Sequence, residues 1–142
     1  MKNLISYLQL VLMLPLIFGC RGNQNQMPYV PVDIYINTSL PAYSNLNIIG
    51  GWVYVTGGND GIIVYRQSYE TVVAYERKCT FELPNSCGYG VVDSTNFIVE
   101  CDCDGTKYSI FDGTVLEGPA PYALYQYRTS YDPNSGQLHI SN

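Results

Sequence analysis

Two cysteine-bearing segments constrain the fold of this chain more than any other feature. The first cysteine loop, residues 78–90, follows the run at 72–75, and the second, residues 101–105 (CDCDG), follows the run at 97–100. Both preceding runs are rich in β-branched and aromatic residues, which favours strands. We therefore expect two β-hairpins whose loops face each other. Between them the loops would hold a metal cluster, a disulfide, or only their own packing.

The composition supports a single all-β domain. The chain has 142 residues, which suits one domain, and it contains 14 Tyr, 13 Gly and 8 Pro. Aromatic and turn-forming residues in these numbers favour many short strands separated by turns such as GGNDG at 57–61. No segment shows a helical period. Strands are expected at residues 30–36, 47–55, 62–66, 71–77, 91–92, 96–100, 107–111, 114–116, 123–128 and 137–140.

The charge of the chain excludes one class of partner. The formal net charge is −5, with only 7 Lys and Arg and no cluster of them. Recognition of a phosphate backbone or of an anionic membrane needs a basic patch. We therefore expect no nucleic-acid partner.

The N-terminus has the pattern of an exported lipoprotein. Lys2 precedes an apolar segment at residues 8–18 that is too short to span a bilayer. Gly19 and Cys20 follow it, which resembles a bacterial lipobox, in which the cysteine is lipidated and becomes the first residue of the mature protein. The alternatives are an ordinary secretory signal or an uncleaved anchor. The predicted division is a lipoprotein signal peptide at 1–19, a polar tether at 20–28 and a β domain at 29–142.

Lipidation of Cys20 would determine where the protein resides. Acyl chains on this residue would attach the chain to a membrane surface without a spanning helix. Arg21 after the cysteine points, by analogy with enteric sorting, to the outer membrane of a Gram-negative bacterium. We therefore predict a location in the bacterial cell envelope, with the membrane contacted through the lipid anchor and a protein partner for the domain.

The predicted domain keeps four cysteines, and their pairing is open at this point. An even number of cysteines in an exported chain is typical of disulfides, and three pairings are available. An all-cysteine [2Fe–2S] or zinc site is also feasible, although zinc ribbons use Cys-x2-Cys twice. Thiol oxidoreductases use Cys-x-x-Cys at a helix N-terminus, which this sequence lacks. The four are Cys79, Cys87, Cys101 and Cys103.

Carboxylates and tyrosines near these segments have alternative interpretations. Glu82, Glu100, Asp102 and Asp104 could bind a divalent cation, but no loop has calcium-motif spacing, and a solvated acidic surface is the simpler interpretation. Four tyrosines could form a carbohydrate or protein contact surface, or they could fill half-buried strand positions. No Ser/His/Asp set, phosphate loop or catalytic carboxylate pair stands out, so an enzyme is not expected. The tyrosines are Tyr122, Tyr125, Tyr127 and Tyr131.

Taken in order, several segments resemble a Rieske domain. The resemblance covers residues 46–140, and it implies an all-β sandwich of small antiparallel sheets, three in number. It also implies that the two cysteine-bearing hairpin loops lie at one end and that a Gly-Pro loop covers them. The matching segments are GIIVYR at 61–66, AYERKC at 74–79, CxCxGxxYS at 101–109, DG at 112–113, and GPA at 118–120 with Leu124.

The ligand set of a Rieske centre is incomplete here. Such a centre uses Cys-x-His in one loop and Cys-x-x-His in the other. Carried onto this sequence, Cys79 and Cys101 fall at the cysteine positions, whereas Phe81 and Asp104 fall at the histidine positions. Phenylalanine has no lone pair for iron, and the only histidine, His139, lies in the last expected strand, where we predict a structural role. A conventional cluster is therefore excluded by ligand count.

The resemblance also implies a disulfide. Some Rieske proteins carry one beside the cluster, and Cys87 and Cys103 resemble those positions. Without iron, Cys79 and Cys101 would face each other as thiols and would close if their geometry allows. We expect a lipoprotein with one or two disulfides and no cofactor, acting as a structural or interaction module. The alternative is a [2Fe–2S] or other metal-binding electron-transfer protein with Cys79, Cys101 and Asp104 as ligands.

Overall fold

The computed structural model describes residues 26–142. The predicted signal peptide, the lipidated Cys20 and most of the tether lie outside the described residues. Within the described part, no helix has both the length and the apolar character that a membrane crossing needs. The structure therefore describes the domain, and the lipid anchor remains a prediction.

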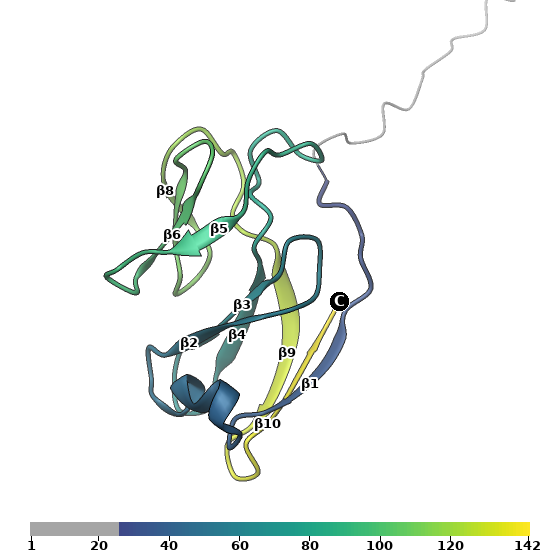
Figure 1. The fold of residues 1–142 in the computed structure, drawn as a ribbon, viewed down its shortest axis with the longest axis vertical. Helices are drawn as coiled ribbons and strands as arrows, with labels where there is room; N and C mark the ends of the chain where they lie inside the picture. Colours follow the sequence, from purple (N-terminus) through teal and green to yellow (C-terminus); the bar gives the residue numbers. More distant parts are fainter. Residues whose placement is uncertain (1–25) are drawn as a thin grey trace, which may run out of the picture.

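The described residues form an all-β domain with one short 3-10 helix (Figure 1). Each of the strands expected from the sequence has a counterpart, displaced by a few residues at the ends. The elements are β1 (Asp33–Asn37), η1 (Pro41–Asn47), β2 (Trp52–Val55), β3 (Ile62–Arg66), β4 (Val72–Glu76), β5 (Gly90–Val92), β6 (Ile98–Cys101), β7 (Lys107–Ser109), β8 (Val115–Glu117), β9 (Gln126–Asp132) and β10 (Gln137–Ser141).

The largest local difference from expectation lies before β2. The expected strand at 47–55 begins only at Trp52, because η1, which Pro41 starts, runs to Asn47 and residues 48–51 then form a turn. Gly50 then has a φ of 86°, a left-handed conformation that glycine adopts without strain. At Gly51 a Cβ atom would lie 1.8 Å from the carbonyl oxygen of Asn45, so only glycine fits this close approach.

The strands form two antiparallel sheets where the Rieske resemblance implied three. The larger sheet has the order β1-β10-β9-β4-β3-β2, and the smaller has the order β5-β6-β7-β8. The smaller sheet lies at one end of the larger, as Figure 1 shows. Strand β9 explains the difference: its residues 128–132 pair with β10, whereas Tyr127 and Gln126 pair with β4. It thereby joins two of the expected sheets into one curled sheet.

Strands β3 and β4 form a wall between two hydrophobic cores. All residues of both strands are buried. Because side chains alternate along a strand, Ile63 and Tyr65 face one core and Ile62 and Val64 face the other. The first core is shared with the smaller sheet and contains Cys79 and Cys101. The cysteine loops are therefore built directly onto one of the two cores.

Candidate functional site

Main-chain hydrogen bonds close both cysteine loops. Strand β4 leads into the first loop, in which the Cys79 amide donates to the Gly88 carbonyl at 3.2 Å. Strand β6 leads into the second, in which the Cys101 amide donates to the Thr106 carbonyl at 2.8 Å. Each cysteine therefore begins a closed turn, Cys101 as the last residue of β6 and Cys79 three residues after the end of β4. The expected pair of facing hairpin loops is confirmed.

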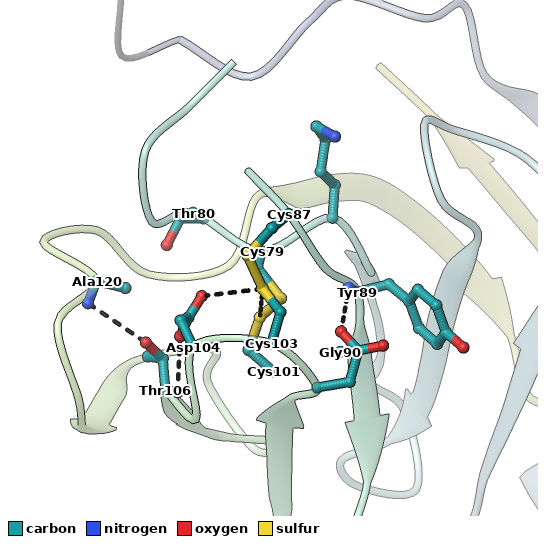
Figure 2. Close-up of a disulfide and its surroundings, with 12 residues drawn as sticks. Cys79, Thr80, Cys87, Tyr89, Gly90, Cys101, Cys103, Asp104, Thr106 and Ala120 are labelled. Atoms are coloured by element: carbon teal, nitrogen blue, oxygen red, sulfur yellow. Dashed lines mark hydrogen bonds between the residues drawn. A yellow bond between two sulfur atoms is a disulfide. The ribbon is translucent and has the colours of Figure 1, made fainter. Parts of the chain in front are cut away.

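The two loops also bind each other. The amide of Tyr89, from the first loop, donates to the Asp102 carboxylate of the second at 3.0 Å (Figure 2). A Cβ atom on Gly88 would lie 2.1 Å from the same carboxylate and 2.8 Å from Cys103 Sγ, so the loops approach as closely as glycine permits. This contact positions the sulfur atoms of one loop over those of the other.

Two disulfides join the loops. Cys79 is bonded to Cys101, and Cys87 is bonded to Cys103, with Cα atoms 6.1 Å apart in each pair. These Cα separations fall within the range usual for disulfides. Of the pairings open from the sequence, this is the one that the Rieske resemblance implied, and it is confirmed.

The two disulfides differ in exposure and touch each other. Cys79 and Cys101 are 0% and 1% exposed, and they form the inner disulfide. Cys87 and Cys103 are exposed, and they form the outer disulfide. The Sγ atoms of Cys101 and Cys103 are 4.0 Å apart, so the bonds lie side by side (Figure 2). The site is thus a buried disulfide beneath an exposed one.

The residues at the two histidine positions have structural roles. The Phe81 ring packs against the core that contains the inner disulfide. Asp104 accepts a hydrogen bond from the Thr106 amide at 2.8 Å, and its other carboxylate oxygen is 3.9 Å from Cys103 Sγ. Neither side chain offers iron the nitrogen ligand that a histidine would supply.

His139 lies on β10, outside the cysteine loops, as expected. Its Nε2 is 2.6 Å from an Asp33 carboxylate oxygen, and its ring stacks on Tyr35 with centroids 4.3 Å apart. Both partners belong to β1, the edge strand that pairs with β10. The structural role predicted for this histidine agrees with these contacts.

The donor atoms in this arrangement do not fit a [2Fe–2S] group. Cys79 Sγ, Cys101 Sγ and one Asp104 oxygen lie within 4.8 Å of one another, so the alternative ligand set is brought together. However, the two sulfur atoms are bonded to each other. Iron and zinc are bound by thiolates, which a disulfide does not supply.

The carboxylates near the loops do not assemble into an oxygen-ligand site. Every convergent group of potential ligands among residues 26–142 includes two cysteines. Asp102 is engaged by the Tyr89 amide, and Glu100 lies opposite Lys107 on β7. The interpretation of a solvated acidic surface is therefore preferred over a divalent-cation site.

The Gly-Pro loop covers the site through residues that sequence reasoning did not single out. Thr80 Oγ1 donates to the Tyr122 carbonyl at 2.5 Å, and it lies 3.1 Å from the Tyr108 hydroxyl. On the other side, the Ala120 amide donates to Thr106 Oγ1 at 3.4 Å (Figure 2). Tyr108 belonged to the motif that carried the resemblance, but Thr80 and Thr106 had no signal in the sequence.

The four tyrosines divide between the two interpretations. Tyr122 and Tyr125 are 50% and 40% exposed and lie beside the first cysteine loop. Tyr127 is buried, and Tyr131 packs against the second core, where its ring lies 4.2 Å from the Arg66 guanidinium carbon. The first pair is available for contact, and the second pair is structural.

Glu76 is the most consequential residue that the sequence analysis missed. It ends β4, is 0% exposed, and accepts hydrogen bonds from the amides of Asn59, Asp60 and Lys78 at 2.7–3.0 Å. The Tyr127 hydroxyl also donates to it, at 2.7 Å. Burial raises the pKa of Glu76, but these hydrogen bonds outweigh burial and hold the pKa below its ordinary value. Glu76 thus anchors the turn at 57–61 and the start of the first cysteine loop.

Comparison with known proteins identifies the fold. No protein-family model and no curated protein matches this chain. The chain is similar to a solved chain described as the complex of reduced oxygenase and oxidized ferredoxin in carbazole 1,9a-dioxygenase, with 19% identity and a TM-score of 0.50. The match covers 76% of this chain and 93% of the other. At this identity, the likeness establishes the fold alone.

A second solved structure is also similar to this chain, at a lower identity. It is the ferredoxin of carbazole 1,9a-dioxygenase from Nocardioides aromaticivorans IC177, with 15% identity and a TM-score of 0.47. That match covers 79% of this chain and 97% of the other. The class defined by the first likeness and by the loops is a Rieske-like sandwich of small antiparallel sheets with two cysteine-bearing hairpin loops at one end. The expected fold class is confirmed.

Proposed function

We propose that this chain is a membrane-anchored, extracytoplasmic lipoprotein whose Rieske-like domain has no conventional cluster and acts as a structural or interaction module. The observation that carries the proposal is the bond between Cys79 and Cys101, which stand at the two cysteine ligand positions. Disulfides persist in oxidising compartments outside the cytoplasm, which agrees with an exported chain. The loops that would bind a cluster are covalently closed instead.

An apolar groove beside the loops supports an interaction role. Leu83 of the first cysteine loop lines it together with the exposed Tyr122 and Tyr125. Exposed aromatic side chains are typical of protein contact surfaces. Gln26 and Met27 line the same groove, so the N-terminal end of the described chain lies beside the first cysteine loop. A partner bound there would lie on the membrane-facing side of an anchored domain.

The oxidation state of the purified full-length chain tests the proposal for the loops. After export, and purification with no added reductant, we expect a colourless protein with no stoichiometric iron and no thiol that reacts after denaturation. The reason is that the four cysteines of the domain are disulfide-bonded, and that the fifth, Cys20, carries its lipid on sulfur in the proposed mature protein. Absorbance in the visible range with stoichiometric iron and sulfide would instead support the alternative, an electron-transfer protein with Cys79, Cys101 and Asp104 as ligands.

Substitution of Cys20 tests the anchor. In cells that express the full chain, Cys20→Ser should move the protein from the membrane fraction to the soluble fraction, because the acyl chains are lost. Incorporation of radiolabelled palmitate should be lost with it. The matched control is Cys87→Ser, which removes a cysteine from the domain and should leave fractionation and labelling unchanged. Membrane retention of Cys20→Ser would contradict the lipoprotein assignment.

A further inference from the structure

We propose that the two disulfides form an internal thiol–disulfide exchange relay. In this relay an external dithiol reduces the exposed outer disulfide, and Cys103 then passes the reducing equivalents to the buried inner one. The partner is therefore a dithiol donor of the thiol–disulfide oxidoreductase class. The inference goes beyond the proposed function. It depends on the positions of the sulfur atoms, and it requires neither the lipid anchor nor a protein bound at the groove.

The first step of the argument is access. A thiolate must reach a sulfur atom directly to exchange with a disulfide. The inner sulfur atoms belong to residues that are 0% and 1% exposed, within the core that also contains Leu124 and Ala120. The outer disulfide joins two exposed residues. An external thiol can therefore attack the outer disulfide while the domain stays folded, and it cannot attack the inner one.

The second step is proximity. Cys101 Sγ and Cys103 Sγ are 4.0 Å apart, close to van der Waals contact. The turn that separates them is fixed by the hydrogen bond from the Gly105 amide to the Cys101 carbonyl, at 3.1 Å. A nucleophile held beside its target reacts as if it were present at very high concentration. Once the outer disulfide opens, Cys103 is thus already placed against the inner one.

The exchange balances in atoms and electrons. A thiolate of the donor attacks Cys87 Sγ, the Cys87–Cys103 bond breaks, and Cys103 leaves as a thiolate. The second thiol of the donor then resolves the mixed disulfide, which leaves a donor disulfide and a Cys87 thiol. The Cys103 thiolate attacks Cys101 Sγ, a Cys101–Cys103 bond forms, and the Cys79–Cys101 bond breaks. Cys79 takes the electron pair and a proton from solvent.

The product of the first round contains one new disulfide at the surface. One dithiol has been oxidised, Cys79 and Cys87 are thiols, and the remaining Cys101–Cys103 disulfide includes the exposed Cys103. A second dithiol can reduce it by attack at Cys103 Sγ and give four thiols. Each donor molecule loses two electrons and two protons, and the protein gains them. In the opposite direction, the disulfide form of the same donor class takes up these electrons and protons and so reoxidises the buried pair from the surface.

Two single substitutions test the relay as a matched pair. Cys87→Ser and Cys103→Ser both remove the outer disulfide and both leave one free cysteine, but only Cys87→Ser keeps the sulfur that touches Cys101. The full-length variants are incubated with dithiothreitol under native conditions. The thiols of Cys79 and Cys101 are then counted over time by alkylation and peptide mass spectrometry. We expect reduction of the inner pair to be at least about tenfold faster in Cys87→Ser than in Cys103→Ser.

A parallel measurement separates the relay from loss of structure. In denaturant most of the difference between the two variants should disappear, because dithiothreitol then reaches the inner disulfide directly. Equal rates under native conditions as well would overturn the relay. If the native rates are equal but the wild-type protein is colourless and free of thiols, the relay is wrong and the proposed function stands. The two failures are therefore distinguishable.

Discussion

Replacement of Glu76 by alanine is expected to lower the free energy of unfolding by about 3–5 kcal/mol. The carboxylate accepts hydrogen bonds from three main-chain amides and from the Tyr127 hydroxyl, in a buried position. Each buried donor left without an acceptor costs about 1–3 kcal/mol, and solvent can reach only some of them once the side chain is gone. Chemical denaturation followed by circular dichroism measures the loss.

Two control substitutions isolate the role of the charge. Glu70→Ala removes an exposed carboxylate just before the same strand, and it should change the free energy of unfolding by less than about 0.5 kcal/mol. Glu76→Gln keeps the shape and one acceptor oxygen but removes the charge. Its loss in free energy of unfolding should therefore lie between those of Glu70→Ala and Glu76→Ala. A stability equal to wild type in Glu76→Ala would show that the turn at 57–61 does not depend on this side chain.

The same carboxylate gives the domain a defined acid sensitivity. Because the pKa of Glu76 in the folded protein lies below its ordinary value of 4.5, its stabilisation is complete above the unfolded value and is lost as pH falls through the folded one. Wild-type protein should therefore lose more stability between pH 6 and about pH 3 than Glu76→Gln, which has no proton to gain at this position. Equal losses would assign the acid sensitivity to other groups.

Removal of the inner disulfide is the second large effect. The double variant Cys79→Ala/Cys101→Ala should lose about 3–4 kcal/mol of stability, because the bond closes a loop with a sequence separation of 22. Its sulfur atoms also belong to a hydrophobic core, so their removal leaves unfilled space. Denaturation of the oxidised proteins measures this loss, with full oxidation confirmed by thiol counting.

The outer disulfide supplies the matched control. Cys87→Ala/Cys103→Ala opens a loop with a separation of 16, for which chain entropy predicts almost the same loss. Any further loss in the inner variant therefore measures packing around Cys79 and Cys101. An inner variant more stable than the outer one would contradict the view that the buried bond is part of the core.

Much of the fold was predictable because it is encoded locally. The GGNDG turn at 57–61 joins the runs at 47–55 and 62–66, and residues 67–70 turn the chain again before the run at 71–77. These successive antiparallel strands therefore follow from short-range pattern alone. The ligand count at the cysteine loops was equally direct. Phe81 cannot bind iron whatever its surroundings, so the absence of a conventional ligand set could be inferred before any coordinates.

Other features depended on contacts between distant segments. Nothing in the sequence of β9 indicates that its two halves pair with different strands, and η1 lacks the length for a helical period. Glu76 was predicted simply as part of a strand, because its donors are main-chain amides whose positions only the folded turn defines. The 4.0 Å contact between Cys101 and Cys103 likewise appears only when both disulfides are placed.

The hairpin of β3 and β4 has a consequence for how this sequence can diverge. Its residues are buried on both faces, because each face belongs to a different core. A polar substitution on a half-exposed strand can turn toward solvent, but here it would enter one core or the other. Descendants of this chain should therefore keep these positions longest, while the loops at the end of the domain are free to exchange their chemistry.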